Sequence, residues 1–154
     1  MSKSILILYA TMTGNAEFAA KRVASAAEKR GFIPKVSDVN GHKFEDIARE
    51  PRVALVVSTY GEGDPPPDAE DFRDWLEAQS EGVFGGVQFS VYALGDTSYE
   101  SFCGFGKTVD AEFERLGARR VAERWDNDLD FEDNLNEWID KALAAFDAAK
   151  PASV

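Results

Sequence analysis

The sequence predicts an α/β fold built on a doubly wound, mainly parallel sheet. Short apolar runs rich in Val, Ile and Leu alternate with amphipathic stretches, in the order strand then helix, five times along the chain. Runs of this kind are typical of strands that are buried on both faces, so helices are expected to cover both sides of the sheet. No linker or internal repeat divides the chain, and we expect residues 1–154 to form one domain.

Each apolar run and each amphipathic stretch predicts one element. The expected strands are Ser4 to Tyr9, Pro34 to Val39, Val53 to Ser58, Gln88 to Leu94 and Arg119 to Ala122. The expected helices are Asn15 to Lys29, Phe44 to Arg49, Ala69 to Gln79, Lys107 to Leu116 and Phe131 to Ala148. Gly31 and Gly117 are expected to end the first and fourth helices, because glycine is favoured at the residue that follows a helix.

The composition limits the kinds of partner that the protein is expected to bind. The 28 acidic and 17 basic residues give a net charge of -11, and nucleic acid is not expected as a partner because phosphate backbones are bound through basic patches. No apolar window approaches the roughly 20 residues of a membrane span. The single cysteine, Cys103, rules out an intramolecular disulfide, and His42 is the single histidine, so no metal site is predicted. We expect a monomeric, cytoplasmic protein without a membrane partner.

The segment between the first strand and the first helix is expected to bind a phosphate group. It consists of Thr11, Met12, Thr13, Gly14, Asn15 and Ala16. The first turn of a helix presents unpaired backbone N–H groups and the positive end of the helix dipole, and Thr and Asn side chains add neutral donors. The segment lacks the glycine patterns of nucleoside-triphosphate and dinucleotide sites, and no Lys or Arg lies between Ile5 and Ala20. These features indicate a monophosphate held by neutral dipoles.

Two further loops follow strands and are therefore expected at the same edge of the sheet. The first runs from Ser58 to Pro67 and contains two glycines that let its backbone approach a ligand closely. The second runs from Leu94 to Gly106 and is rich in aromatic and hydroxyl side chains. Tyr60 in the first loop and Tyr99 in the second are placed to face each other across a planar ring.

Three segments of the chain resemble, in order and spacing, the motifs of a known family. They are T-x-T-G-N-A-E, S-T-Y-G-E-G-D-P-P and A-L-G-D-T-S-Y-E-x-F-C. The sequence resembles a short-chain flavodoxin, and more particularly the FMN-binding domain of the NADPH-dependent diflavin reductases and of the sulfite reductase flavoprotein. The resemblance covers nearly the whole chain. It implies a flavodoxin-like five-stranded sheet in the order 2-1-3-4-5 and electron transfer through noncovalently bound FMN.

The resemblance also implies which residues contact the cofactor. It places the FMN phosphate on the first motif, the flavin ring between Tyr60 and Tyr99, and at Gly61 a carbonyl that turns toward the flavin N5. The residues expected to contact FMN are Thr11, Met12, Thr13, Gly14, Asn15, Ala16, Ser58, Thr59, Tyr60, Gly61, Glu62, Gly63, Leu94, Gly95, Asp96, Tyr99, Phe102, Cys103 and Asp126. The family also has an acidic residue beside the flavin after the fifth strand, and the spacing does not choose between Asp126 and Asp128.

Two positions depart from the family's pattern. Met12 stands where relatives often carry Gln, so one side-chain donor to the phosphate is lost while the backbone N–H remains. Asp96 stands where many relatives carry Asn. A carboxylate near the flavin should disfavour the anionic reduced form of the cofactor.

The sequence shows no nucleophile with a base and no second domain for a nicotinamide, so we expect an electron carrier rather than a substrate-converting enzyme. It would carry electrons between an NAD(P)H-dependent flavoprotein reductase and a redox acceptor protein, which dock on an acidic surface near the flavin. The acidic residues expected there are Glu62, Asp64, Asp68, Glu70, Asp71, Glu100, Asp126 and Asp128. Two alternatives stay open: an FMN domain or subunit of a larger NADPH-dependent diflavin reductase, and a flavin-binding protein with a non-redox role.

Overall fold

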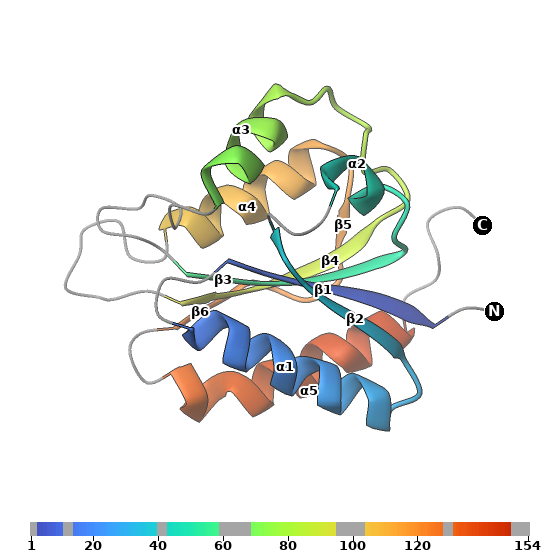
Figure 1. The fold of residues 1–154 in the computed structure, drawn as a ribbon. Helices are drawn as coiled ribbons and strands as arrows, with labels where there is room; N and C mark the ends of the chain where they lie inside the picture. Colours follow the sequence, from blue (N-terminus) through green and yellow to red (C-terminus); the bar gives the residue numbers. More distant parts are fainter. Residues whose placement is uncertain are drawn as a thin grey trace.

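A parallel sheet lies between two layers of helices, α1 and α5 on one face and α2, α3 and α4 on the other (Figure 1). The structure is a computed structural model that describes residues 3–10, 14–39, 43–58, 69–94, 104–127 and 131–148, apart from the side chains of 131–133. Its elements are β1 (Ser4–Ala10), α1 (Asn15–Lys29), β2 (Ile33–Asp38), α2 (Phe44–Ile47), β3 (Arg52–Ser58), α3 (Glu70–Ala78), β4 (Gln88–Leu94), α4 (Gly104–Arg115), β5 (Arg119–Arg120), β6 (Trp125–Asn127) and α5 (Phe131–Ala148).

The strand order confirms the predicted topology. The main path of the sheet runs β2-β1-β3-β4-β5, and each neighbouring pair is parallel. The edge strand differs from the expected single segment Arg119 to Ala122, because it consists of β5 and β6, which both pair with β4. Between the two segments, residues 121–124 lie opposite Ser90 and Val91 of β4. Four residues cannot stay in register with two, so the edge strand leaves the ladder and then rejoins it.

Side chains of the central strands alternate between the two helix layers. In β1, Leu6 and Leu8 belong to the core under α3 and α4, whereas Ile5 and Ile7 belong to the core over α1 and α5. Four of the seven β1 residues and all seven of β4 are buried in consecutive positions. This double burial explains why the strands read as continuous apolar runs.

The two helix layers use different side chains to cover the sheet. The buried face of α1 consists of small residues spaced for one side of a helix: Ala16, Ala19, Ala20, Val23 and Ala27. The core on the opposite face of the sheet is rich in aromatic rings from the helices, from β4 and from the segment that precedes β4: Phe72, Phe84, Phe89, Phe105 and Phe113. The rings of Phe84 and Phe113 lie 4.7 Å apart between centroids. In this layer α4 approaches β4 so closely that a Cβ at Gly106 would overlap the Cβ of Ala93.

Several local predictions are confirmed. Gly31 and Gly117 follow α1 and α4, and the next residue of each donates its backbone N–H to a carbonyl of the last helical turn, Phe32 to Ala27 at 3.0 Å and Ala118 to Phe113 at 2.9 Å. The third and last helices pack on the sheet through aromatic residues, Phe72 in α3 and Trp138 in α5. The Trp138 ring lies 5.1 Å from that of Tyr92.

Candidate functional site

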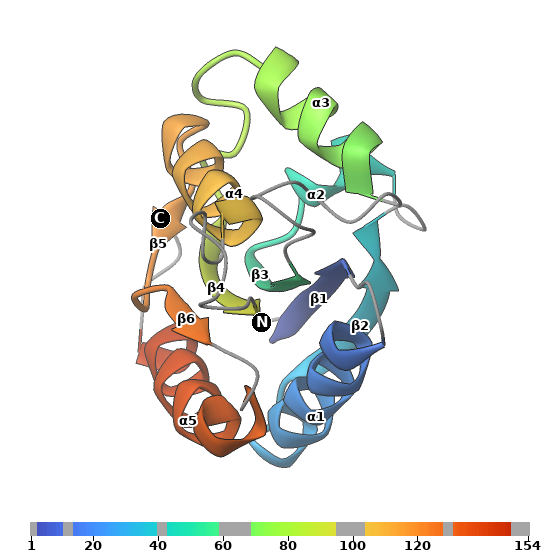
Figure 2. The same ribbon diagram turned by 90° about the vertical axis from the view of Figure 1, so that its left-hand side faces the viewer.

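The carboxyl ends of β1, β3, β4 and β6 lie together at one end of the strands, which we call the rim. The rim faces the viewer in Figure 2. The register places these strand ends level: Ala10 pairs with Val57, and Ser58 pairs with Leu94. Leu94 also pairs with Asn127 at the end of β6. Two of the residues predicted from the sequence, Ser58 and Leu94, are therefore the last residues of their strands at this rim. A ligand of a doubly wound sheet binds at this end of the strands.

Helix α1 begins at the rim with a backbone suited to an anion. Gly14 is the N-cap residue, with φ 91° and ψ -8°, and its carbonyl accepts a hydrogen bond of 3.0 Å from the Phe18 N–H. A Cβ at Gly14 would meet no atom within 4 Å, so glycine is favoured there by the left-handed backbone and not by lack of space. Asn15 and the buried Ala16 follow in the first turn, where backbone N–H groups and the helix dipole attract negative charge.

The acidic side chain in this turn is already paired. Glu17 lies in the first turn of α1 and binds the Lys21 ammonium at 3.0 Å, one turn along the helix. The hydrogen bond to Glu17 raises the pKa of Lys21, so the lysine stays charged and is neutralised locally. The described part of this site therefore fits a phosphate group held by neutral backbone donors.

Tyr9 lies one residue before the end of β1 and is half-buried. Burial raises the pKa of its phenol, and the neighbouring carboxylates of Glu17 and Asp38 raise it further. The hydroxyl therefore remains neutral at physiological pH and adds no negative charge beside the start of α1.

Asp126 reaches the rim in β6, but its charge is compensated. It pairs with Ala93, one residue before the end of β4. Arg124 donates to both carboxylate oxygens, from Nε to Oδ1 at 2.7 Å and from Nη2 to Oδ2 at 3.3 Å. Three-quarters of each of these side chains is buried. Asp126 is thus one half of an ion pair, whereas the sequence alone presents it as a free acid.

Asn127, the last residue of β6, is bound to α5. Its side-chain oxygen accepts a hydrogen bond of 2.9 Å from Nδ2 of Asn134 in the first turns of α5, and the residue is 3% exposed. This contact joins the end of β6 to the start of α5 across the segment 128–130.

Most of the predicted contact residues lie outside the described residues. These are Thr11, Met12, Thr13, Thr59, Tyr60, Gly61, Glu62, Gly63, Gly95, Asp96, Tyr99, Phe102 and Cys103. Asp128, the alternative to Asp126, also lies outside them. The described members Gly14, Asn15, Ala16, Ser58, Leu94 and Asp126 share the rim.

Sequence reasoning missed Arg124 and Asn127. The available signal for Arg124 was its position two residues before Asp126 in an alternating strand, which puts both side chains on one face. For Asn127 no local pattern gave a signal, since it lies five residues beyond the expected end of the edge strand. Both were obscured because the strand was expected to end at Ala122.

The described residues contain neither a candidate membrane span nor a candidate metal site. No helix among them is both long and apolar enough to cross a bilayer. Within the same ranges no three His, Cys, Asp or Glu side chains gather in a way that would hold a metal ion.

Comparison with known proteins gives one family. The sequence pattern of the family described as flavodoxin matches residues 7–139, which is most of the chain.

Relatives with high identity are longer proteins. The chain is 37% identical over 149 residues to the sulfite reductase [NADPH] flavoprotein alpha-component of Bacillus subtilis, covering 97% of this chain and 25% of that protein. It is 41% identical over 149 residues to the protein of the same name from Neisseria meningitidis serogroup B, covering 96% of this chain and 25% of that protein. The chain thus spans about a quarter of the length of these relatives.

Solved structures similar to this fold are flavodoxins of matching length. A short-chain flavodoxin associated with a non-canonical PDU bacterial microcompartment superposes with a TM-score of 0.80 at 27% identity, covering 95% of this chain and 99% of that one. The flavodoxin of Streptococcus pneumonia TIGR4 superposes with a TM-score of 0.79 at 27% identity, covering 92% of this chain and 98% of that one.

Proposed function

Because the chain belongs to the flavodoxin family of FMN-containing electron-transfer proteins, we propose that it carries electrons between an NAD(P)H-dependent flavoprotein reductase and a redox acceptor protein. The observation that carries this proposal is the family match over residues 7–139, which includes all three loops that follow the rim strands. When bound, FMN supplies the one-electron and two-electron chemistry. The protein supplies binding, orientation and electrostatics.

The proposed binding mode uses backbone donors for the phosphate and aromatic faces for the ring. Thr11 to Ala16 would surround the phosphate, and the left-handed Gly14 at the start of α1 supports this assignment. Tyr60 and Tyr99 would stack on the two faces of the ring, with Gly61 beside its N5 and Asp96 at its pyrimidine edge. Ser58 and Leu94 end the strands from which these two loops leave.

Docking is proposed at acidic residues around the rim. In the described part of the chain, Glu70 and Asp71 in the first turn of α3 are exposed, whereas Asp126 is paired with Arg124. The acidic surface is therefore expected on the α3 side of the rim, together with Glu62 and Asp64 of the preceding loop. We further propose that the protein works as a monomer in the cytoplasm.

A second candidate is the FMN domain or subunit of a larger NADPH-dependent diflavin reductase. The observation that favours it is that the curated relatives are about four times as long as the matched region, since the match covers 25% of each. In that case the electron donor would be a second flavin domain in the same complex. A third candidate, a flavin-binding protein with a non-redox role, shares the site but requires no electron partner.

Reconstitution with FMN followed by anaerobic reduction tests the function. We expect the purified chain to bind one FMN per protein and to take up electrons in two separate one-electron steps as dithionite is added. Tyr99→Ala should weaken FMN binding, since ring stacking contributes about 0.5–1.5 kcal/mol beyond buried area. Tyr92→Phe, in the core against Trp138, is the matched control and should leave the affinity unchanged. A chain that takes up no FMN would contradict the proposal.

Salt dependence tests the docking surface and separates the candidates. Reduction of the FMN-loaded protein by a separate NADPH-dependent flavoprotein reductase should slow as salt rises, because steering fields raise association rates about 10 to 10³-fold and are screened over about 8 Å at physiological salt. Neutralising Glu62 and Asp64 should slow association more than neutralising Glu28 and Glu81, which lie in the chain shortly before the amino ends of β2 and β4. No reduction by any separate reductase would favour the diflavin-domain candidate.

A further inference from the structure

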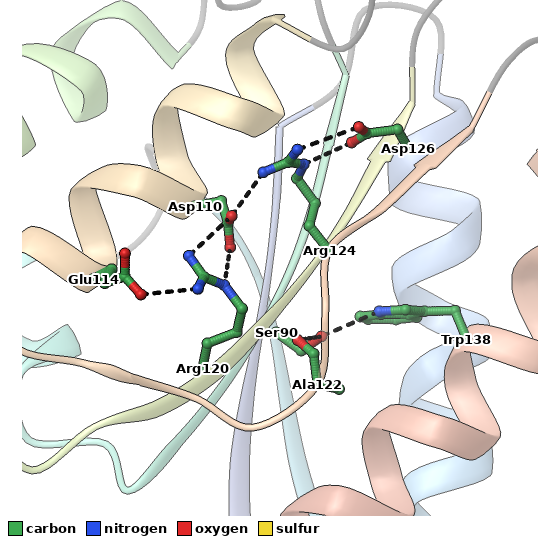
Figure 3. Close-up of polar contacts among 8 residues, drawn as sticks. All are labelled: Ser90, Asp110, Glu114, Arg120, Ala122, Arg124, Asp126 and Trp138. Atoms are coloured by element: carbon green, nitrogen blue, oxygen red, sulfur yellow. Dashed lines mark hydrogen bonds and ion pairs between the residues drawn. The ribbon is translucent and has the colours of Figure 1, made fainter.

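The split edge strand is held to the rest of the molecule by side chains on both of its faces (Figure 3). On the α5 face, the buried Ser90 hydroxyl accepts the Trp138 indole N–H at 3.2 Å and donates to the Ala122 carbonyl at 3.2 Å. On the α4 face, the carboxylate of Asp110 receives two arginines. Arg120 donates Nε and Nη2 to its two oxygens at 2.9 and 3.0 Å, and Arg124 donates Nη1 at 2.7 Å.

Arg124 connects this anchor to the rim. Its Nη1 binds Asp110 in the middle of α4, while its Nε and Nη2 bind Asp126 in β6. Figure 3 shows the guanidinium lying between the two carboxylates. The planar fork of arginine suits two carboxylates at once, which a lysine ammonium does not match in geometry. The hydrogen bond that Arg124 donates to Asp126 is the largest influence that raises the pKa of Arg124, so the guanidinium stays charged.

Asp110 and the two arginines form what we call the Asp110 cluster. The two arginines bind different elements outside it. Arg120 binds Asp110 and the exposed Glu114, and both of these belong to α4. Arg124 alone of the two reaches β6, whose Asp126 pairs with Ala93 one residue before the end of β4. Loss of either arginine therefore removes one partner of Asp110, but loss of Arg124 also releases a carboxylate at the rim.

We propose that Arg124 is a positioning residue for the cofactor: it turns the Asp126 carboxylate toward α4 and compensates its charge, so that Asp126 does not act as a free anion beside the flavin. This inference rests on the proposed function, which places FMN at the rim. A released carboxylate would disfavour the reduced, more negative form of the cofactor.

A double-mutant cycle on the FMN-loaded protein tests the inference, with midpoint potentials measured by anaerobic titration. Arg124→Gln should weaken the binding of fully reduced FMN relative to that of the preceding redox state about tenfold, which lowers the corresponding one-electron potential by about 59 mV. In the Asp126→Asn background, Arg124→Gln should shift this potential much less, because the larger part of the shift comes from movement of the released carboxylate and only the smaller part from loss of the arginine charge itself. Arg124→Lys keeps the charge and should shift the potential less than Arg124→Gln.

Arg120→Gln is the matched control. It removes a comparable ion pair from Asp110 without touching Asp126, so it should lower the urea midpoint of the apoprotein but leave the potentials unchanged. If Arg124→Gln does not fold, Arg124→Lys takes its place, and its shift in potential is compared with and without Asp126→Asn. Equal shifts from Arg120→Gln and Arg124→Gln, or the same Arg124→Gln shift with and without Asp126, would overturn the inference.

The outcomes also separate this inference from the proposed function. A parent protein that binds FMN while Arg124→Gln keeps its potentials overturns the positioning role alone. A parent protein that binds no FMN overturns the proposed function and this inference with it.

Discussion

The two edges of the sheet are held by different means. At one edge, β2 pairs with β1 through six consecutive residue pairs, from Ser4 with Ile33 to Tyr9 with Asp38. At the other edge, β5 contributes two pairs and β6 three, with a break between them. The β2 edge exposes the apolar side chains Ile33, at 61%, and Val36, at 38%. The β5/β6 edge instead carries charged side chains that bind back to α4.

The difference shows that a continuous backbone ladder reduces the need for side-chain contacts at an edge strand. Where the backbone hydrogen bonds are unbroken, the side chains of an edge strand add little to its attachment, and apolar residues can stay exposed. Where two strand segments are too short to hold by themselves, buried side-chain contacts must fix the chain. Substitutions of side chains should therefore be costly at the β5/β6 edge and nearly neutral at the β2 edge.

The largest effect is expected at Asp110. Asp110→Asn keeps the size of the side chain but removes the charge that holds Arg120 and Arg124. Removing one partner of a buried ion pair costs roughly 3–5 kcal/mol, and we expect about 2–3 kcal/mol here because each arginine side chain is about a quarter exposed. Urea unfolding of the apoprotein measures this. Glu114→Gln is the control, since its exposed side chain should contribute below about 1 kcal/mol.

A smaller effect is expected from Ser90 on the other face of the same edge. Ser90→Ala leaves the Trp138 indole N–H and the Ala122 carbonyl without the hydroxyl that joins them. An unsatisfied buried donor costs about 1–3 kcal/mol, and thermal unfolding should show a loss in that range. Ser25→Ala on α1 should change stability by less than about 0.5 kcal/mol. Equal effects at the two serines would mean that the hydroxyl does not anchor the break.

Pro34 tests the opposite edge. Pro34→Val should change the free energy of unfolding by less than about 0.5 kcal/mol, because the ladder to β1 is already complete. It adds a backbone N–H on the open side of β2, next to the exposed Ile33, and edges of this kind pair with other chains. Sedimentation velocity should therefore show more self-association than in the parent. A large loss of stability without association would show that side chains matter at this edge too.

The smallest effect concerns Asp147, near the start of β2. Its hydrogen bond with Lys3, at 2.8 Å, lowers its pKa below the ordinary value of 3.8. A carboxylate with a lowered pKa in the folded state contributes stability above pH 3.8, and that contribution is lost as pH falls through the lowered pKa. An NMR titration of Lys3→Met should return the pKa of Asp147 toward 3.8. High salt should act in the same direction on the parent protein.

The sequence predicts the buried elements accurately because burial leaves a pattern. The bounds of β4 and α5 are Gln88–Leu94 and Phe131–Ala148, as expected, since β4 is mostly apolar and α5 repeats its apolar positions at helical spacing. β6 was missed because Trp125, Asp126 and Asn127 form no apolar run. Its pairing is fixed by β4 and by contacts to distant residues, which no local pattern records.

The start of α4 was wrong for a related reason. The helix was expected from Lys107 because Gly104 and Gly106 are poor helix formers, yet it begins at Gly104. The tertiary contact explains the difference, since the missing Cβ of Gly106 is what lets α4 reach Ala93. At the candidate site, the sequence identifies which loops meet at the rim because strand direction decides it. It does not show that Asp126 is neutralised, because the compensating contact depends on how the edge strand breaks.

The Asp110 cluster should also respond to heat differently from the aromatic core around Phe84 and Phe113. The cost of dehydrating charged groups falls as temperature rises, whereas the hydrophobic gain per unit area levels off. The coupling between Asp110 and its two arginines should therefore account for a growing share of stability on warming. As the protein approaches its melting temperature, the ion pairs at the broken edge would then weaken relatively less than the hydrophobic contacts of this core.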